Sequence, residues 1–237
     1  MRHTRIIQYP AILLLFVFAA TPLSAFETLQ LFGNIDQAHI TAEMTILAQN
    51  SRQSRTIEVL YDRRNADDYR LLSRITAPPF LRNMKFLVVR ESGHPNTWIK
   101  TSRGVRRIAE QGTSEPVFQS DFLIQDFYGW GIDAEAVELG SADDPGRTRY
   151  QAQAGDTVLR FTMDSEYGLI SEIEFLSSGG DLLRHYTVNS FQWIDGQPYP
   201  HTARMETPPD DTSTELRIES VNGKPSFTSR TFNPAGL

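Results

Sequence analysis

The chain has 237 residues, no cysteine and a formal net charge of −6 at neutral pH. The lack of cysteine excludes a fold held together by disulfide bonds, and the acidic balance argues against nucleic-acid binding, which requires a basic face. The length suits one β-rich domain, because β-sandwiches and β-barrels often run to about 200–250 residues.

The first 25 residues have the features of a secretory signal peptide. Arg2 and Arg5 form a basic start, residues 11–20 form an apolar centre, and the tripeptide Leu-Ser-Ala ends at Ala25. An uncleaved membrane anchor is the alternative, but a helix that spans the membrane needs about 20 apolar residues. We therefore expect cleavage after Ala25 and a single mature domain of residues 26–237 with a net charge of −8.

From residue 40 onward, short runs of alternating apolar and polar residues are separated by turn-forming residues. In the first run, Ala42, Met44 and Ile46 lie on one face of a predicted strand. We count about eleven such strands, mostly joined by short turns, which predicts a largely antiparallel sheet. The Asn-Gly pair at residues 222–223 predicts a hairpin between the last two strands.

Few helices are expected: residues 27–38, residues 120–129 and, more weakly, residues 134–139. Ser120 is a good N-cap and Asp121 suits the positive start of a helix. The apolar side chains of the second helix either plug a β-rich core or also line a pocket for an apolar ligand. These side chains are Phe122, Leu123, Ile124, Phe127 and Tyr128.

Three arginines, Arg103, Arg106 and Arg107, precede this helix. At the mouth of a pocket their guanidinium groups could bind an anionic headgroup or an acidic partner. Alternatively, they pair with nearby acids such as Glu110 or Glu115 on a solvated loop. The sequence leaves both interpretations open.

Signatures of catalysis are absent from the sequence. The histidines form no H-E-x-x-H or H-x-H arrangement, and neither a G-x-S-x-G motif nor a phosphate-binding glycine loop is present. Adjacent acids such as Asp143 and Asp144 point apart on a strand and suit turns better than a catalytic pair. We therefore expect no enzymatic activity, no metal and no cofactor.

Several motifs of the chain, taken in order, resemble the outer-membrane lipoprotein-sorting proteins of the LolA/LolB-like superfamily. The resemblance extends from about residue 40 to the end of the chain, and Gln119 stands where the family often has glycine. The motifs are Trp98, Arg106-Arg107-Ile108, Ser120-Asp121-Phe122 and Asp126-Phe127.

The resemblance implies a mainly β fold with few helices, an antiparallel, unclosed β-barrel with a helical plug or lid over an apolar cavity. It also implies a monomeric carrier or chaperone in the periplasm of a Gram-negative bacterium, which binds lipoprotein acyl chains or another lipid for transport toward the outer membrane. We expect the ligand-binding residues to be Trp98, Arg106, Arg107, Asp121, Phe122, Phe127 and Tyr128.

Two other functions are compatible with the same resemblance. One is an RseB-like envelope sensor or regulatory binding module, although those proteins carry a second domain for which this chain has little room. The other is a lipid-binding accessory of an inner-membrane efflux-type transporter. The expected partners are lipoprotein or lipid cargo, an inner-membrane transporter and an outer-membrane acceptor, and no nucleic acid.

Overall fold

The computed structural model describes residues 35–65, 67–109, 112–128, 136–142 and 144–237. These residues form one 13-stranded antiparallel sheet. The strands, in chain order, are β1 Gln37–Ala48, β2 Ser51–Arg63, β3 Tyr69–Ala77, β4 Lys85–Glu91, β5 His94–Thr101, β6 Gly104–Ile108, β7 Val137–Ser141, β8 Arg147–Ala154, β9 Thr157–Asp164, β10 Leu169–Leu176, β11 Leu182–Ile194, β12 Gln197–Thr207 and β13 Thr212–Asn222.

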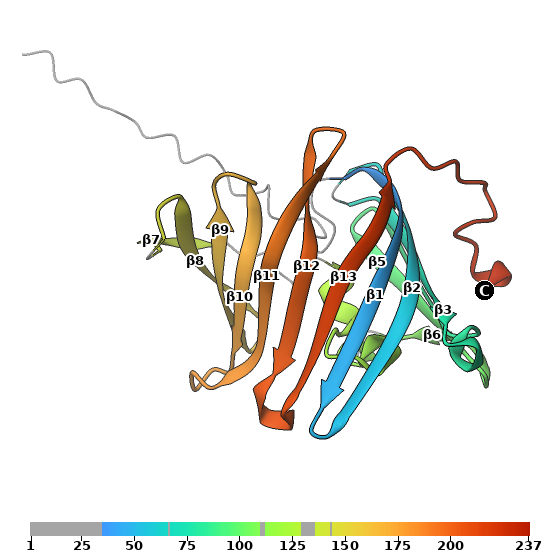
Figure 1. The fold of residues 1–237 in the computed structure, drawn as a ribbon, viewed down its shortest axis with the longest axis horizontal. Helices are drawn as coiled ribbons and strands as arrows, with labels where there is room; N and C mark the ends of the chain where they lie inside the picture. The colour runs from blue at the N-terminus through green and yellow to red at the C-terminus, as the bar shows by residue number, and fades with distance from the viewer. Residues whose placement is uncertain (1–34, 66, 110–111, 129–135, 143) are drawn as a thin grey trace, which may run out of the picture.

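Two meanders, β1 to β6 and β7 to β13, make up the sheet. They join where β1 pairs with β13, in a register that runs from His39 opposite Asn222 to Ala48 opposite Thr212. The strand order is therefore β6 to β1 followed by β13 to β7, with β6 and β7 at the two edges. The sheet curves strongly, and within the described residues its edges do not pair, so it stays unclosed (Figure 1).

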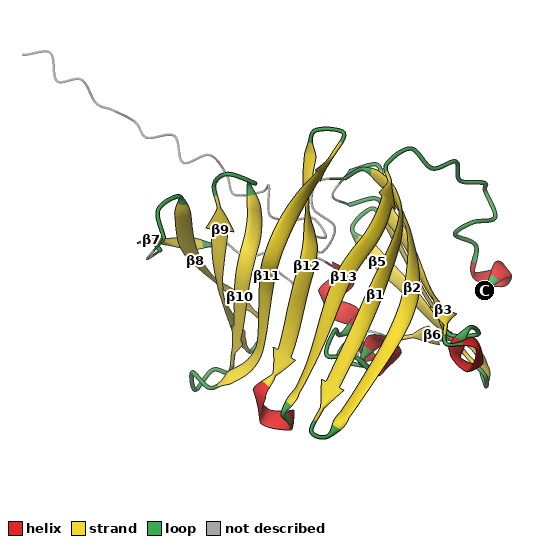
Figure 2. Cartoon of the chain, viewed as in Figure 1, coloured by secondary structure: helices red, strands yellow, loops and turns green. Residues whose placement is uncertain are grey.

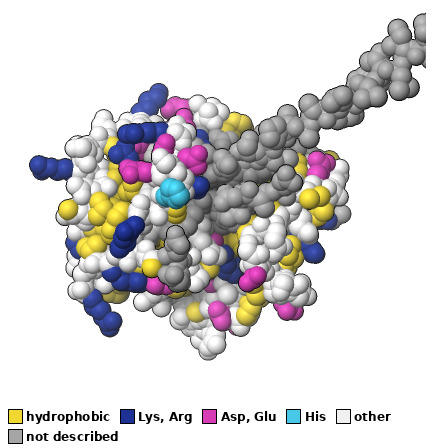
Figure 3. All heavy atoms as spheres, turned by 180° about the vertical axis from the view of Figure 1, so that it is seen from behind, with side chains coloured by type: hydrophobic (Ala, Val, Ile, Leu, Met, Phe, Trp, Pro, Cys, Tyr) yellow, Lys and Arg dark blue, Asp and Glu magenta, His cyan; other side chains and the backbone are white. Residues whose placement is uncertain are grey.

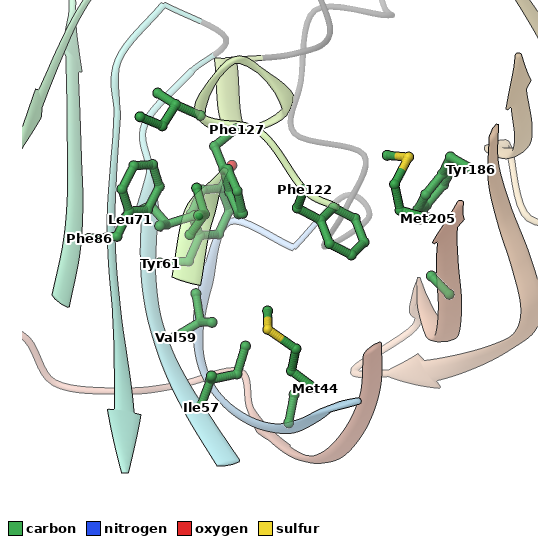
Figure 4. Packing of buried hydrophobic residues seen from close by; sticks show 14 of the residues in the cluster. Met44, Ile57, Val59, Tyr61, Leu71, Phe86, Phe122, Phe127, Tyr186 and Met205 are labelled. Carbon is green, nitrogen blue, oxygen red and sulfur yellow. The ribbon is translucent and has the colours of Figure 1, made fainter. Parts of the chain in front are cut away.

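The main hydrophobic core lies on the concave face of the sheet. Alternation along the strands places Met44 of β1 and Val59 of β2 on this face. Phe122 lies in the middle of the core, between Phe86 on one side and Tyr186 on the other (Figure 4). The Phe122 and Tyr186 rings meet edge to face, with centroids 6.5 Å apart. Phe122 therefore lies in the core between the two halves of the curved sheet.

Residues 112–128, called the inner loop below, run across the concave face. Where a helix was expected, this loop contains two short 3-10 turns, at Val117–Gln119 and Ile124–Tyr128 (Figure 2). The expected helical plug is wrong, because the described residues contain no α-helix. None of the described helical turns has the length and hydropathy to cross a membrane.

The hydrogen bonds of Ser120 explain why no α-helix forms in the inner loop. Its hydroxyl donates to the carbonyl of Val117 at 2.6 Å and accepts the backbone N–H of Phe122 at 3.2 Å. Phe118 and Gln119 have φ of 55° and 59°, in the left-handed region that interrupts a right-handed helix. The expected role of Ser120 as a helix N-cap is therefore wrong, because its side chain stabilises a reversal of the chain.

Several other expectations need correction. The sheet has 13 strands where about eleven were counted, although the antiparallel arrangement is confirmed. Residues 137–139, expected to be helical, belong to strand β7. The Asn-Gly hairpin is wrong, because β13 ends at Asn222 and no strand follows it in the described chain. The signal peptide and residues 27–34 of the first expected helix lie outside the described residues.

The C-terminal segment after β13 covers part of the convex face. Phe232 is buried there against Leu72 and Leu87, and the partly buried Trp98 packs against the same small cluster. The Arg70 guanidinium lies 4.9 Å from the centroid of the Phe232 ring. Trp98 therefore belongs to the face opposite the core, and the sheet separates it from Phe122.

We expect Phe122→Ala to lower the free energy of unfolding by about 3–5 kcal/mol, because it leaves a cavity among packed side chains of both meanders. Phe80→Ala is the matched control, since Phe80 is 82% exposed and Phe122 is fully buried. Urea denaturation of the three proteins measures the difference. Equal midpoints for Phe122→Ala and the wild type would contradict the position of Phe122 in the core.

Candidate ligand-binding site

The concave face and the inner loop enclose a small apolar cavity, called the chamber below. Its volume is about 30 Å³, close to the volume that one water molecule occupies in the liquid. Pockets for small molecules usually measure about 300–1,000 Å³, so the chamber in this closed form is nearly filled by side chains. The lining residues are Ala42, Met44, Ile57, Val59, Ser73, Val117, Phe118, Phe127, Pro200, Ala203, Leu216 and Ile218.

Asp121 anchors the inner loop to β13. Its carboxylate accepts hydrogen bonds from the hydroxyls of Thr212 and Thr214, the latter at 2.6 Å. The backbone N–H of Asp121 donates to the Thr214 hydroxyl at 2.9 Å. Asp121 and Thr214 are both buried, so these bonds lie out of contact with bulk water.

A buried ion pair anchors the same loop to β11. The Arg184 guanidinium donates to both carboxylate oxygens of Asp126, at 2.7 and 2.9 Å, and lies 4.2 Å from the centroid of the Phe175 ring. The backbone N–H of Leu123 also donates to Asp126, at 2.7 Å. The side chain of Asp126 is fully buried and that of Arg184 is 9% exposed. Because both charges are paired in two-pronged geometry, the pair is specific for this position of the loop.

The third anchor comes from the other half of the sheet. The hydroxyl of Tyr69, in β3, donates to the backbone carbonyl of Phe127 at 2.7 Å. The Phe127 ring packs against Phe86 with centroids 5.1 Å apart. Hydrogen bonds from β3, β11 and β13 thus hold the buried part of the inner loop, and Arg55 of β2 and Arg106 of β6 bond its Gln119 and Glu115.

Of the apolar residues expected at the site, the structure brings only some together. Phe122 and Phe127 lie on the concave face, with Asp121 beside them as an anchor of the loop. Trp98 lies on the convex face and cannot line the same cavity. Tyr128 ends the second 3-10 turn, and its side chain is outside what the structure describes.

Arg106 and Arg107 lie in the edge strand β6 and are exposed. Arg106 pairs with Glu115 and lowers the pKa of that carboxyl through a hydrogen bond, as the solvated-loop interpretation expected. Arg107 donates to the side chain of Asn96. Neither arginine reaches the chamber, so their binding role stays a prediction.

Arg106 borders a surface groove of about 510 Å³, called the rim groove below. Figure 3 shows the molecule from behind, with hydrophobic surface between basic side chains on one half of that face. The rim groove is lined by Phe80, Leu81, Asn83, Met84, Thr101, Ser102, Arg103, Gly104, Val105, Arg106 and Gln119.

Sequence reasoning missed the partner of Asp126. Arg184 lies 58 residues further along the chain, so no local motif joins the two. A signal does exist, because Arg184 and Tyr186 lie on the same, buried face of β11. An arginine at an inward position of a strand requires a buried acceptor, but the sequence alone does not identify which one.

The described concave face is mainly apolar. Burial raises the pKa of Tyr61 and of Tyr186, so both phenols stay neutral at neutral pH. Among the residues that the structure describes, no group of three or more histidine, aspartate or glutamate side chains could hold a metal ion. The chamber wall offers mainly apolar contacts.

A protein-family model described as "-like: Uncharacterized protein" matches residues 67–237. This region extends from the start of β3 to the end of the chain and contains the whole inner loop. No curated protein matches the sequence.

Three solved structures are similar over most of their length. A DUF1329 family protein from Desulfovibrio piger has a TM-score of 0.76 and 15% identity, covering 91% of this chain and 99% of that one. A domain from Vibrio parahaemolyticus described as outer membrane lipoprotein-sorting has a TM-score of 0.73 and 19% identity. The match covers 84% of this chain and 90% of that one. A LolA superfamily protein from Nitrosomonas europaea has a TM-score of 0.70 and 14% identity. The match covers 92% of this chain and 100% of that one. At these identities the likeness concerns the fold, and at that level it confirms the resemblance expected from the motifs.

We expect Asp126→Ala to lower the free energy of unfolding by about 3–5 kcal/mol, because it leaves Arg184 buried without its partner. Glu115→Ala is the matched control: it breaks the exposed pair with Arg106, and such pairs contribute about 0–1 kcal/mol. The double variant Asp126→Leu with Arg184→Met should recover much of the loss. Urea denaturation gives all three values, and equal losses for Asp126→Ala and Glu115→Ala would show that the buried pair does not anchor the loop.

Proposed function

The chain belongs to the protein family whose model matches residues 67–237, and from this membership and its LolA-like fold we propose that it is a periplasmic carrier for lipid or lipoprotein acyl chains. The observation that carries the proposal is the apolar chamber, covered by a loop that is held at a few polar anchors. The cargo would occupy the concave face beneath the inner loop. It would then travel toward the outer membrane.

Loading requires the inner loop to move, because the closed chamber of about 30 Å³ has no room for an acyl chain. The free energy is available from the cargo itself. Burial of a methylene group contributes about 0.8 kcal/mol, so twelve methylenes contribute about 10 kcal/mol. This gain can offset the contacts that the loop loses when it opens.

The polar anchors suit a loop that opens and closes. When Asp121 and Asp126 leave the sheet, water replaces the hydrogen bonds that they lose, so each bond to a carboxylate costs only about 1.5–3 kcal/mol net. The sheet differs, because long ladders join β1 to both β2 and β13. We therefore expect the sheet to stay fixed while the inner loop moves away from it.

Two further observations support the cargo and its location. The domain from Vibrio parahaemolyticus, described as outer membrane lipoprotein-sorting, has the same fold. The basic and apolar N-terminal residues have the features of an export signal. Because the sequence has no nucleotide-binding motif, unloading would need an acceptor with a better site, such as an outer-membrane protein. An accessory of an inner-membrane transporter would use the same chamber, and its acceptor would distinguish the two roles.

We expect the wild type to bind an uncharged fluorescent acyl ester, and Thr214→Val to bind it more tightly. Thr214 is fully buried and bonds only the closed loop at Asp121, so its loss makes opening less costly. Thr214→Val removes two hydrogen bonds to Asp121, and their loss, at least about 1 kcal/mol together, corresponds to a gain in affinity of at least about 5-fold.

Trp98→Ala is the control for this titration, because Trp98 lies on the convex face and its loss should leave the affinity unchanged. Native mass spectrometry of protein purified gently from the periplasm provides an independent test, with co-purifying lipid or acylated peptide expected. A wild type that binds no acyl ester and carries no lipid would exclude the carrier function.

A further inference from the structure

Arg55 is a buried cation with incomplete hydrogen bonding. It belongs to β2 and lies on the concave face of the sheet, the same face as Ile57 and Val59. Only 3% of its surface is exposed. Its Nη2 donates to Gln53 at 3.0 Å and to Gln119 at 3.3 Å. Its Nε and Nη1 are buried without a hydrogen-bond partner, and no carboxylate of the described residues pairs with it.

Arg184 shows how the same face satisfies a buried guanidinium when the role is structural. It has a two-pronged carboxylate partner, Asp126, and an aromatic ring beneath it. Arg55, by contrast, donates only from Nη2, to the side-chain amide oxygens of Gln53 and Gln119. A buried charge without a counter-charge destabilises a fold, so a residue of this kind needs another reason to be there.

The position of Arg55 joins the two cavities described above. Met44 lies opposite Arg55 on β1, and Ile57 is the next inward residue of β2. Both Met44 and Ile57 line the chamber. On the other side, the Gln119 side chain that bonds Arg55 is exposed and lines the rim groove. The guanidinium therefore lies between the apolar chamber and a groove that opens to solvent.

We propose that Arg55 binds the anionic headgroup of the cargo while the acyl chain fills the chamber. The ligand class is thus an acyl amphiphile with a carboxylate or phosphate head. This inference rests on the proposed carrier function and adds the chemistry of its cargo.

The geometry of the guanidinium suits such a head. An anion that displaces Gln119 from Nη2 gains two adjacent donors, Nη2 together with either Nη1 or Nε, and such two-pronged bonds to anions are strong. Burial lowers the pKa of Arg55, yet a guanidinium keeps its proton at neutral pH. Arg103 lines the groove outside and adds positive charge along the approach.

The test is competition against the uncharged fluorescent acyl ester. The competitors are hexadecanoate and its methyl ester, a monoacylglycerol phosphate and the matching monoacylglycerol, and acetate and inorganic phosphate as heads without chains. For the wild type we expect each anionic amphiphile to bind at least tenfold more tightly than its neutral counterpart. Acetate and inorganic phosphate should not compete at equal concentration, because they bury no chain.

Arg55→Gln should bind neutral and anionic amphiphiles equally, with the neutral affinity of the wild type. Arg55→Lys should keep part of the preference for the anions. Arg106→Gln is the matched control, an exposed arginine on the same groove, and should keep the full preference. A purely structural role would instead lower the unfolding midpoint of Arg55→Gln, whereas we expect a midpoint at or above that of the wild type.

Each contrary result has a distinct meaning. Equal affinity of the wild type for hexadecanoate and its methyl ester overturns the headgroup role and leaves the carrier function standing. If the wild type binds neither hexadecanoate nor its methyl ester, both the headgroup role and the carrier function are overturned. Competition by inorganic phosphate or acetate at the same concentration as the amphiphiles overturns the acyl-amphiphile assignment in favour of a free anion. A preference for anions that survives in Arg55→Gln overturns the assignment to Arg55.

Discussion

The concave face of a strongly curved sheet is apolar and must be covered, and in the described chain the inner loop covers its centre. Phe122 and Phe127 supply the apolar contacts of this cover, and Asp121 and Asp126 fix its position. Every other feature of the candidate site depends on this arrangement. A cover built from turns with a few polar anchors can separate from its frame without disturbing the strand ladders.

The two buried arginines of the concave face illustrate how structure and function differ at this site. Arg184 has its acceptor within the chain and closes the loop over the core. Arg55 lies beside the chamber with two nitrogens unsatisfied. Proteins accept such local destabilisation where a ligand makes up for it, and the stability of the sheet elsewhere carries the loss.

Much of the fold followed from the sequence, because strand alternation and turn residues are local signals. The antiparallel sheet and the strand at Trp98 could both be predicted from neighbouring residues. The face on which Trp98 lies could not, since it depends on the C-terminal segment that packs against it. The inner loop was mistaken for a helix because a cap before an apolar run is typical of both a helix and a tight reversal.

The candidate site was less predictable, because its decisive contacts join distant parts of the chain. Asp126 and Arg184, or Arg55 and Gln119, share no local pattern. The most direct measurement is hydrogen exchange of the inner loop, whose Asp121 amide donates to the Thr214 hydroxyl of β13. With a saturating acyl ligand, we expect this amide to exchange faster while those of the β1–β13 ladder stay protected. Inner-loop protection that stays unchanged while the ligand is bound would contradict the opening of the chamber.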